Sequence, residues 1–220
     1  NMFARSILAL YAALFAIYAG WYHMKRPNLR VITREELAKH AHGAQDGVWV
    51  SLLGHVFDVS SSAHLYGPDG YIIFTGQDAS RAFATGDFSE RGAVEDVTDL
   101  PPNDVQTVYT FLQDTYFPKY PQLGFLQGLY FDAAGTPTAS WATVLRLVDQ
   151  AHSEHDEAAE LEERYPSCSM RWSAVAGGSR WCDDERVPRE ILRHPSRPDK
   201  TRCGCVPPDE DDHRIMRPYA

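Results

Sequence analysis

The stretch YGPDGYIIFTGQDASRAFATGD, residues 66–87, decides how we expect the chain to fold around it. It places two tyrosines and four glycines, with a Gly-Pro-Asp-Gly run, between apolar segments. Glycine, proline and aspartate in such a run predict a tight loop. Asp78 can then cap a short helix that carries Ala79, Ala82 and Phe83. The stretch therefore predicts a loop that faces an apolar helix. A cleft between the loop and that helix would suit a flat ligand.

Two regular elements are expected before this loop. Thr33 and Glu36 stand at the spacing of a capping box, which predicts a short helix directly after Thr33. Residues 47–60, GVWVSLLGHVFDVS, alternate apolar and polar side chains around Gly54-His55 and predict a hairpin. We expect Val48, Val50, Leu52 and Val56 on one face of that hairpin. We expect His40, His42 and His55 at the surface.

A second helix and a further strand are expected after the loop. Asp99-Leu100-Pro101-Pro102 predicts a helix start, because proline is tolerated in the first turn. Residues 117–132 predict a loop followed by a strand. The inner stripe of the helix would be Val105, Val108, Phe111 and Leu112. The order of helix, hairpin, loop, two helices and strand predicts a small α+β domain over residues 28–135.

Two of these segments resemble a known fold. Residues 32–60 resemble the opening of the cytochrome b5-like fold, and residues 66–83 resemble the hallmark of the membrane-associated progesterone receptor (MAPR) family. The continuation FATGD and a tail with a C…W…WC…CxC pattern resemble the neuferricin branch of that family. The resemblance is strong over roughly residues 30–132 and looser over the tail. It implies a domain that binds haem b (iron protoporphyrin IX).

The resemblance also implies how the iron is held. In cytochrome b5 electron carriers two histidines coordinate the haem iron. The first of them lies in a His-Pro-Gly-Gly tetrapeptide, which this sequence lacks. In the MAPR family a tyrosine phenolate is the ligand, and alignment on the Phe-Thr-Gly run assigns that role to Tyr71. Tyr66, Lys119 and Tyr120 match the polar residues that support the bound haem. The motif is one residue shorter than its commoner form, so Tyr66 stays open as the alternative ligand.

General chemistry agrees with a tyrosine ligand. A free phenol has a pKa near ~10, so a cation such as ferric iron must favour the phenolate before it ligates well. A hard anionic ligand favours ferric over ferrous haem and so disfavours electron shuttling. Lys119 and Arg81 are candidate partners for the haem propionates. The expected apolar walls are Ile72, Ile73, Phe74, Phe83, Phe111 and Leu112.

The N-terminal segment is expected to meet a membrane. Residues 6–22 carry no charge, and Lys25 and Arg26 follow them. The run is near the lower length limit for a membrane-spanning helix, and we interpret residues 1–27 as a signal-anchor. A cleavable signal peptide is the alternative, although no small-x-small cleavage site closes the run. The expected location is the endomembrane system or secretory pathway, with the protein membrane-anchored or secreted.

The C-terminal part differs in composition from the central domain. Residues 136–165 predict a helix that extends from the domain into solvent. Residues 166–220 hold all four cysteines and predict a loop-rich tail with two disulfides, which an oxidising compartment would allow. Cys203 and Cys205 should take different partners, because a bridge across one residue is strained. Residues 207–220 are expected to be disordered. By the positive-inside rule, Lys25 and Arg26 favour a cytosolic domain instead, but we give the cysteines more weight.

Charge and motif content limit the functions open to the chain. The formal net charge is −9 and the basic residues are scattered, which argues against nucleic-acid binding. No nucleophile with a base and no phosphate loop stands out, so we expect no enzymatic activity. The leading hypothesis is a haem-binding protein, for which the resemblance implies extracellular signalling in neuronal differentiation. The alternatives are a membrane-anchored protein-interaction adaptor and a b5-type electron donor.

Overall fold

The computed structural model describes residues 29–175, 177–192 and 201–218. The chain divides between Val148 and Asp149 into two compact units, which are described separately below. The predicted anchor within residues 1–27 lies outside the described residues. Within the described part of the chain, no helix is both long and apolar enough to cross a membrane.

A four-stranded sheet organises the first unit. Its strands are β1 (Arg30–Ile32), β2 (Trp49–Leu52), β3 (His55–Asp58) and β4 (Gln122–Leu126). The strand order is β1-β4-β3-β2, in which β1 runs parallel to β4 and the other neighbours are antiparallel. The first and last strands of the unit therefore meet in the sheet, which joins the two ends of the domain.

The β2–β3 hairpin confirms the expected turn. Leu53 and Gly54 both have positive φ, 50° and 74°, the backbone that a tight two-residue hairpin turn requires. Buried Asp78 supports this turn by accepting hydrogen bonds from Ser51 Oγ (2.7 Å) and from the backbone amide of Gly54 (2.8 Å). Ser80 Oγ accepts a further bond from the amide of Leu53, at 2.6 Å. The Asp-Ala-Ser part of the quoted stretch thus holds the hairpin turn to the helix that follows the loop.

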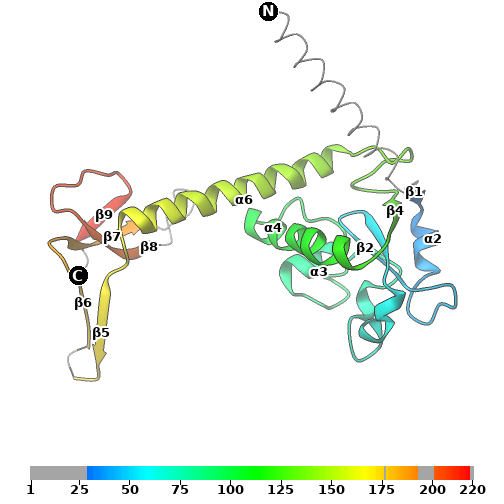
Figure 1. Ribbon diagram of the computed structural model, residues 1–220, viewed down its shortest axis with the longest axis horizontal. Helices are drawn as coiled ribbons and strands as arrows, with labels where there is room; N and C mark the ends of the chain where they lie inside the picture. The colour runs from blue at the N-terminus through cyan, green and yellow to red at the C-terminus, as the bar shows by residue number, and fades with distance from the viewer. Residues whose placement is uncertain (1–28, 176, 193–200, 219–220) are drawn as a thin grey trace, which may run out of the picture. The chain divides into compact units, whose positions relative to one another are not determined.

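Short helices cover the sheet. They are α2 (Arg34–Ala38), α3 (Ser80–Thr85), α4 (Pro102–Phe111) and α5 (Phe117–Lys119). Figure 1 shows α3 and α4 side by side in this unit. Two 3₁₀ segments, Ser60–Tyr66, which is kinked at Ser62, and the single turn Ile72–Phe74, frame the glycine-rich loop. A π-helical turn, Leu112–Tyr116, joins α4 to α5.

The helix starts follow the sequence signals in most details. Thr33 caps α2 by accepting from the amide of Glu36 at 3.2 Å. The Glu36 carboxylate does not return the bond, because it pairs with Arg30 at 2.6 Å. Pro102 opens α4 as expected. The N-cap of α3 is Ala79, and Asp78 supports that helix from one residue earlier by accepting from the amide of Ser80.

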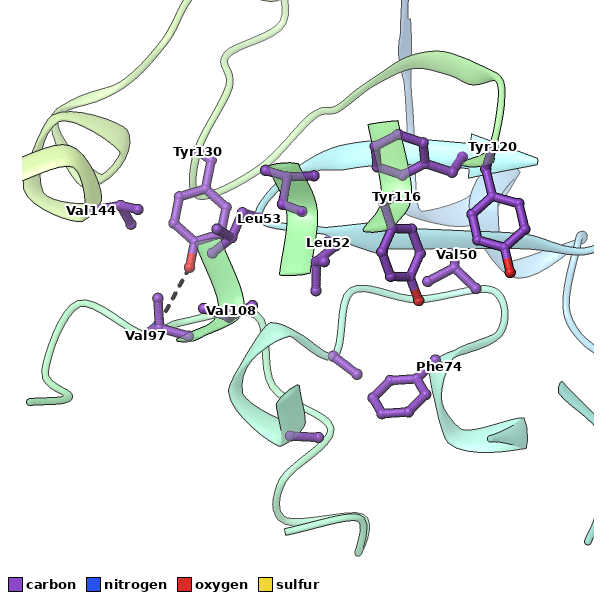
Figure 2. Packing of buried hydrophobic residues seen from close by; sticks show 14 of the residues in the cluster. Val50, Leu52, Leu53, Phe74, Val97, Val108, Tyr116, Tyr120, Tyr130 and Val144 are labelled. Atoms are coloured by element: carbon purple, nitrogen blue, oxygen red, sulfur yellow. Dashed lines mark hydrogen bonds between the residues drawn. The ribbon is translucent and has the colours of Figure 1, made fainter. Parts of the chain in front are cut away.

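The two faces of the sheet bury different side chains. The larger core includes Val50, Leu52 and Phe57 with residues of the loop and helices, and the smaller one includes Ile32, Trp49 and Val56. Figure 2 shows Tyr130 in the larger core, where its hydroxyl accepts a hydrogen bond from the amide of Val97. Val56 was expected beside Leu52, but it pairs with Ser51 across the hairpin and so faces the smaller core.

His55 corrects the expectation that it lies at the surface. It pairs with Leu52 across the turn, which turns its ring into the larger core, where it is 8% exposed. Four aromatic rings surround it at centroid distances of 5.2–5.3 Å, and they belong to Phe117, Phe125, Phe131 and Trp141. His40 is partly buried and stacks on Trp49, whereas His42 is exposed as expected.

The second unit is built around the C-terminal part of α6 (Ala139–Arg164). It contains a hairpin, β5 (Ser169–Ser173) with β6 (Gly177–Trp181), and a sheet of order β8-β7-β9. The strands of that sheet are β7 (Val187–Leu192), β8 (Thr201–Val206) and β9 (Ile215–Pro218).

This unit confirms two expectations about the tail and corrects two others. Disulfides Cys168–Cys203 and Cys182–Cys205 give the two cysteines of the CxC pair different partners. The tail is not mainly loop, because it forms strands around a small core of Leu161, Tyr165, Ile191 and Val206. Residues 207–218 are ordered rather than disordered, because β9 pairs with β7 and Ile215 packs on that core.

Candidate functional site

A pocket of about 250 Å³ opens beside the glycine-rich loop of the first unit. We call it the aromatic pocket, because most of its lining side chains are rings. The lining residues are Leu65, Tyr66, Tyr71, Phe74, Phe83, Phe88, Phe111, Thr115, Tyr116, Lys119 and Tyr120. The loop, α3, α4, the π-helical turn and α5 therefore all contribute to one site.

Phenylalanines form the apolar wall of the aromatic pocket. Phe83 of α3 lies 4.2 Å from Phe74 and 5.6 Å from Phe111 between ring centroids. Phe88, from the loop after α3, lies 5.7 Å from Phe74 and 6.2 Å from Tyr71. Phe88 is 54% exposed, so it stands at the rim.

The loop holds Tyr71 at the same rim. The amide of Tyr71 donates to the carbonyl of Leu65 at 2.8 Å, and the Tyr71 carbonyl accepts from Phe74 at 3.1 Å. Gly70 allows this tight return, because a Cβ there would lie 2.4 Å from the Leu65 carbonyl oxygen. The Tyr71 side chain is 50% exposed and 5.9 Å from the Phe74 ring. Tyr71 is therefore fixed by its backbone while its phenol remains accessible.

Tyr66 is held differently, deep in the pocket wall. It is buried, and its hydroxyl lies 3.1 Å from that of Tyr116. Burial first, and then the neighbouring Tyr116, raise the pKa of Tyr66 well above its ordinary value. Burial likewise raises the pKa of Tyr116. The phenolate form is thus disfavoured at both of these positions.

Tyr120 and Lys119 add the polar character of the site. Burial alone would raise the pKa of Tyr120, but hydrogen bonds with Lys119, Ser62 and Tyr66 outweigh burial and lower it. Lys119 Nζ lies 4.9 Å from the Tyr120 ring centroid, and the lysine is exposed. Figure 2 shows the hydroxyls of Tyr116 and Tyr120 pointing to the side on which Phe74 lies. The pocket thus combines aromatic walls, three phenols that share one network and a cation at the rim.

Comparisons with known proteins identify this unit and the chain as a whole. Residues 33–130 match the model of the "Cytochrome b5-like Heme/Steroid binding domain". Neuferricin of Mus musculus is 32% identical over 226 residues, which covers 94% of this chain and 85% of that protein. Neuferricin of Xenopus tropicalis is 34% identical, with coverages of 82% and 70%. Neuferricin of Homo sapiens is 32% identical, with coverages of 90% and 78%.

The chain belongs to the neuferricin family. The expected α+β cytochrome b5-like domain is confirmed, and the C-terminal helix and disulfide-bonded region accompany it. The domain that this neuferricin-family chain shares with its relatives implies haem binding. Its disulfides and its relatives are consistent with the secretory pathway.

Four of the five predicted site residues come together. Tyr66, Tyr71, Lys119 and Tyr120 all line the aromatic pocket, whereas Arg81 is not among its lining residues. Arg81 instead makes two hydrogen bonds with the Asp99 carboxylate, at 2.6 and 2.9 Å, and a third with the Asp96 carbonyl.

Only some of the residues predicted to form the apolar wall line the aromatic pocket. Phe74, Phe83 and Phe111 line the aromatic pocket, while Leu112 lies inside the core. Ile72 and Ile73 line an outer hollow of about 480 Å³, to which Tyr71 also contributes. The two spaces share Leu65, Tyr71 and Phe88.

The sequence interpretation missed Leu65, Phe88, Thr115 and Tyr116 as site residues. Phe88 follows the quoted stretch directly, and its position in an otherwise polar loop was an available signal. The π-helical turn places Thr115 and Tyr116 in the pocket, and such insertions change the helical phase after Phe111.

The side chains of the aromatic pocket are of the kinds that bind haem, but the pocket alone is small for a haem molecule, so side chains at its rim must move to admit one. A single pocket of about 250 Å³ is small beside the ~300–1,000 Å³ of ordinary ligand sites. The outer hollow adds the missing room where the two spaces share side chains. Tyr71 and Phe88, which line both spaces, are each about half exposed.

Proposed function

We propose that this neuferricin-family protein is a non-enzymatic haem-binding protein of the secretory pathway in which the Tyr71 phenolate binds the iron. The observation that carries the proposal is the contrast between Tyr71 and Tyr66. Tyr71 is half exposed at the rim, whereas Tyr66 is buried and hydrogen-bonded to Tyr116 with a raised pKa. A ligand must reach the iron as a phenolate, so Tyr71 is favoured.

The remaining residues would hold the macrocycle. Phe74, Phe83 and Phe111 supply an apolar wall, and Lys119 supplies a cation at the rim for a propionate carboxylate. When bound, the group would supply a ferric centre with a visible absorption spectrum. Tyr66 and Tyr116 would keep their protons and brace the pocket wall through their shared hydrogen bond.

A tyrosine ligand in place of two histidines argues against a b5-type electron donor. An anionic oxygen ligand stabilises ferric iron and lowers the potential relative to two histidines. Of the three histidines named earlier, His40, His42 and His55, none lines the aromatic pocket, and His55 is enclosed by aromatic rings. An extracellular signalling role in neuronal differentiation, which the resemblance implies, would rest on this haem-binding domain as part of the same proposal.

Hemin titration of the intact chain tests the ligand. We expect a high-spin ferric spectrum that Tyr71→Phe abolishes or strongly weakens, because the substitution removes only the ligating oxygen. Tyr66→Phe should perturb the spectrum without abolishing it. Tyr109→Phe is the matched control, since its ring packs near Trp141 and does not line the pocket.

Three results would redirect the proposal. Loss of the spectrum in Tyr66→Phe but not in Tyr71→Phe would reassign the ligand. Unchanged spectra in both single variants and in the double variant would remove tyrosine ligation altogether and favour the adaptor function. Ready reduction of the bound haem by a flavoprotein reductase would favour the electron donor.

A further inference from the structure

The β5–β6 hairpin of the second unit exposes large apolar side chains. Met170 is 69% exposed, Trp172 is 75% exposed and Val175, in the turn between the strands, is 99% exposed. Figure 1 shows β5 and β6 extending away from β7, β8 and β9 of the same unit. Such side chains on a protruding element are costly to leave in water unless they meet another surface.

The register of the hairpin explains why Trp172 stays uncovered. Trp172 pairs with Gly178, and Met170 pairs with Arg180, so these four residues share one face. Glycine offers no side chain to cover the indole, whose Cδ1 would lie 3.7 Å from a Cβ at position 178. One face of the hairpin therefore presents a tryptophan and a methionine beside an arginine.

The hairpin is also positively charged within an acidic protein. Residues 166–182 contain Arg171 and Arg180 and no acidic residue, whereas the whole chain has a formal charge of −9. The nearest acidic side chain along the sequence, Asp183, accepts hydrogen bonds from Ser169 Oγ and Trp181 Nε1 at the base of the hairpin. The extended part of the hairpin is thus complementary to an anionic surface.

Two disulfides fix both ends of this element. Cys168 lies one residue before β5 and Cys182 one residue after β6, and both are bridged to β8 through Cys203 and Cys205. A hairpin bound in this way loses little chain entropy when its tip is immobilised. The disulfides therefore preorganise the exposed face for docking.

We propose that the hairpin 169–181 docks onto the surface of a membrane that contains anionic phospholipid. Met170, Trp172 and Val175 would enter the headgroup region, where tryptophan is favoured, and Arg180, on the face of Met170 and Trp172, would lie near the lipid phosphates. Arg171 lies on the opposite face, 5.9 Å from the Trp181 ring centroid, and would add positive charge at longer range. Each arginine near such a surface increases partitioning by about fivefold. This inference does not depend on haem binding.

Fluorescence quenching of the intact, oxidised chain tests the docking. The protein is added to vesicles of brominated phosphatidylcholine, with or without phosphatidylserine, and the quenching of Trp172→Phe is subtracted from that of the unsubstituted chain. The subtraction removes the contribution of the other tryptophans, including Trp21. We expect quenching of Trp172 with phosphatidylserine vesicles, and its loss at high salt.

Charge variants provide the control. Arg180→Gln should reduce the Trp172 quenching and Arg171→Gln/Arg180→Gln should remove most of it. Arg91→Gln, an equal charge change on an exposed loop of the first unit, should leave it unchanged. Absence of Trp172 quenching on anionic vesicles would overturn the proposal and leave a protein as the partner of this face. Equal quenching on neutral vesicles, or an equal effect of Arg91→Gln, would also overturn it.

Discussion

Acidification should destabilise the first unit through His55. Desolvation by burial lowers the pKa of His55 from 6.5 to about 4. Its Nδ1 lies 3.0 Å from Gln122 Nε2, while its Nε2 is buried without a hydrogen-bond partner. The amide of Gln122 and the four rings around His55 do not titrate in the acid range, so no neighbouring charge offsets protonation.

The sign and size of the effect follow from linkage. Because the folded-state pKa is depressed, the stability from neutral His55 is fully present above pH 6.5 and is lost as the pH falls toward and through 4. With these two pKa values, the free energy of unfolding falls by about 2 kcal/mol at pH 5 and about 3 kcal/mol at pH 4, relative to neutral pH. Carboxylates such as Asp99, whose pKa the Arg81 hydrogen bond lowers, lose their contribution only at more acidic pH.

Urea unfolding of the intact chain from neutral pH to about pH 5 measures this loss. Buried Trp49 and partly buried Trp141 give the first unit a fluorescence signal, and Trp141 lies 5.3 Å from the His55 ring. His55→Phe keeps a ring inside the aromatic enclosure and should flatten the pH dependence. His64→Gln, at an exposed position, is the matched control and should not. A flat profile in the unsubstituted chain, or an equal slope in His55→Phe, would refute the reasoning.

Three further predictions concern buried Asp78, the disulfides of the second unit and the rim of the aromatic pocket. Asp78→Ala should lower the free energy of unfolding by about 3 kcal/mol or more, because it leaves buried hydrogen-bond donors without an acceptor. The control, Asp69→Ala at an exposed position, should change it by less than about 0.5 kcal/mol. Equal urea midpoints for the two variants would contradict this prediction. Cys182→Ser/Cys205→Ser should destabilise the second unit by about 3 kcal/mol, seen as faster proteolysis there, and unchanged digestion would count against a structural disulfide. Phe88→Ala should speed hemin association in stopped-flow mixing while leaving the final spectrum unchanged; an unchanged rate would show that Phe88 does not restrict entry.

Local signals in the sequence were sufficient for the frame of the first unit. The Thr33 cap, the Gly54 turn and the Pro102 helix start each act within a few residues, and the structure contains all three. The same is true of the separate partners of Cys203 and Cys205, which follow from disulfide geometry alone.

Features that depend on tertiary context could not be obtained in this way. His55 looked like a turn residue, yet pairing with Leu52 placed its ring in the core. Tyr116 entered the pocket through a π-helical turn that a regular helical period does not anticipate. The tail resembled a loop because β5 and β6 bury little surface and lack the apolar alternation of a core strand.

Burial separates the residues that fix the site from those that admit a ligand. Asp78 is 5% exposed and accepts from two donors of the hairpin, on Ser51 and Gly54, and from two donors of Ser80 in α3. Tyr66 is 5% exposed and bonded to Tyr116. Tyr71 and Phe88, between the aromatic pocket and the outer hollow, are each about half exposed. A change in the buried set should therefore alter stability and affinity together. A change at the rim should alter ligation or entry while the domain stays folded, because few buried contacts are lost there.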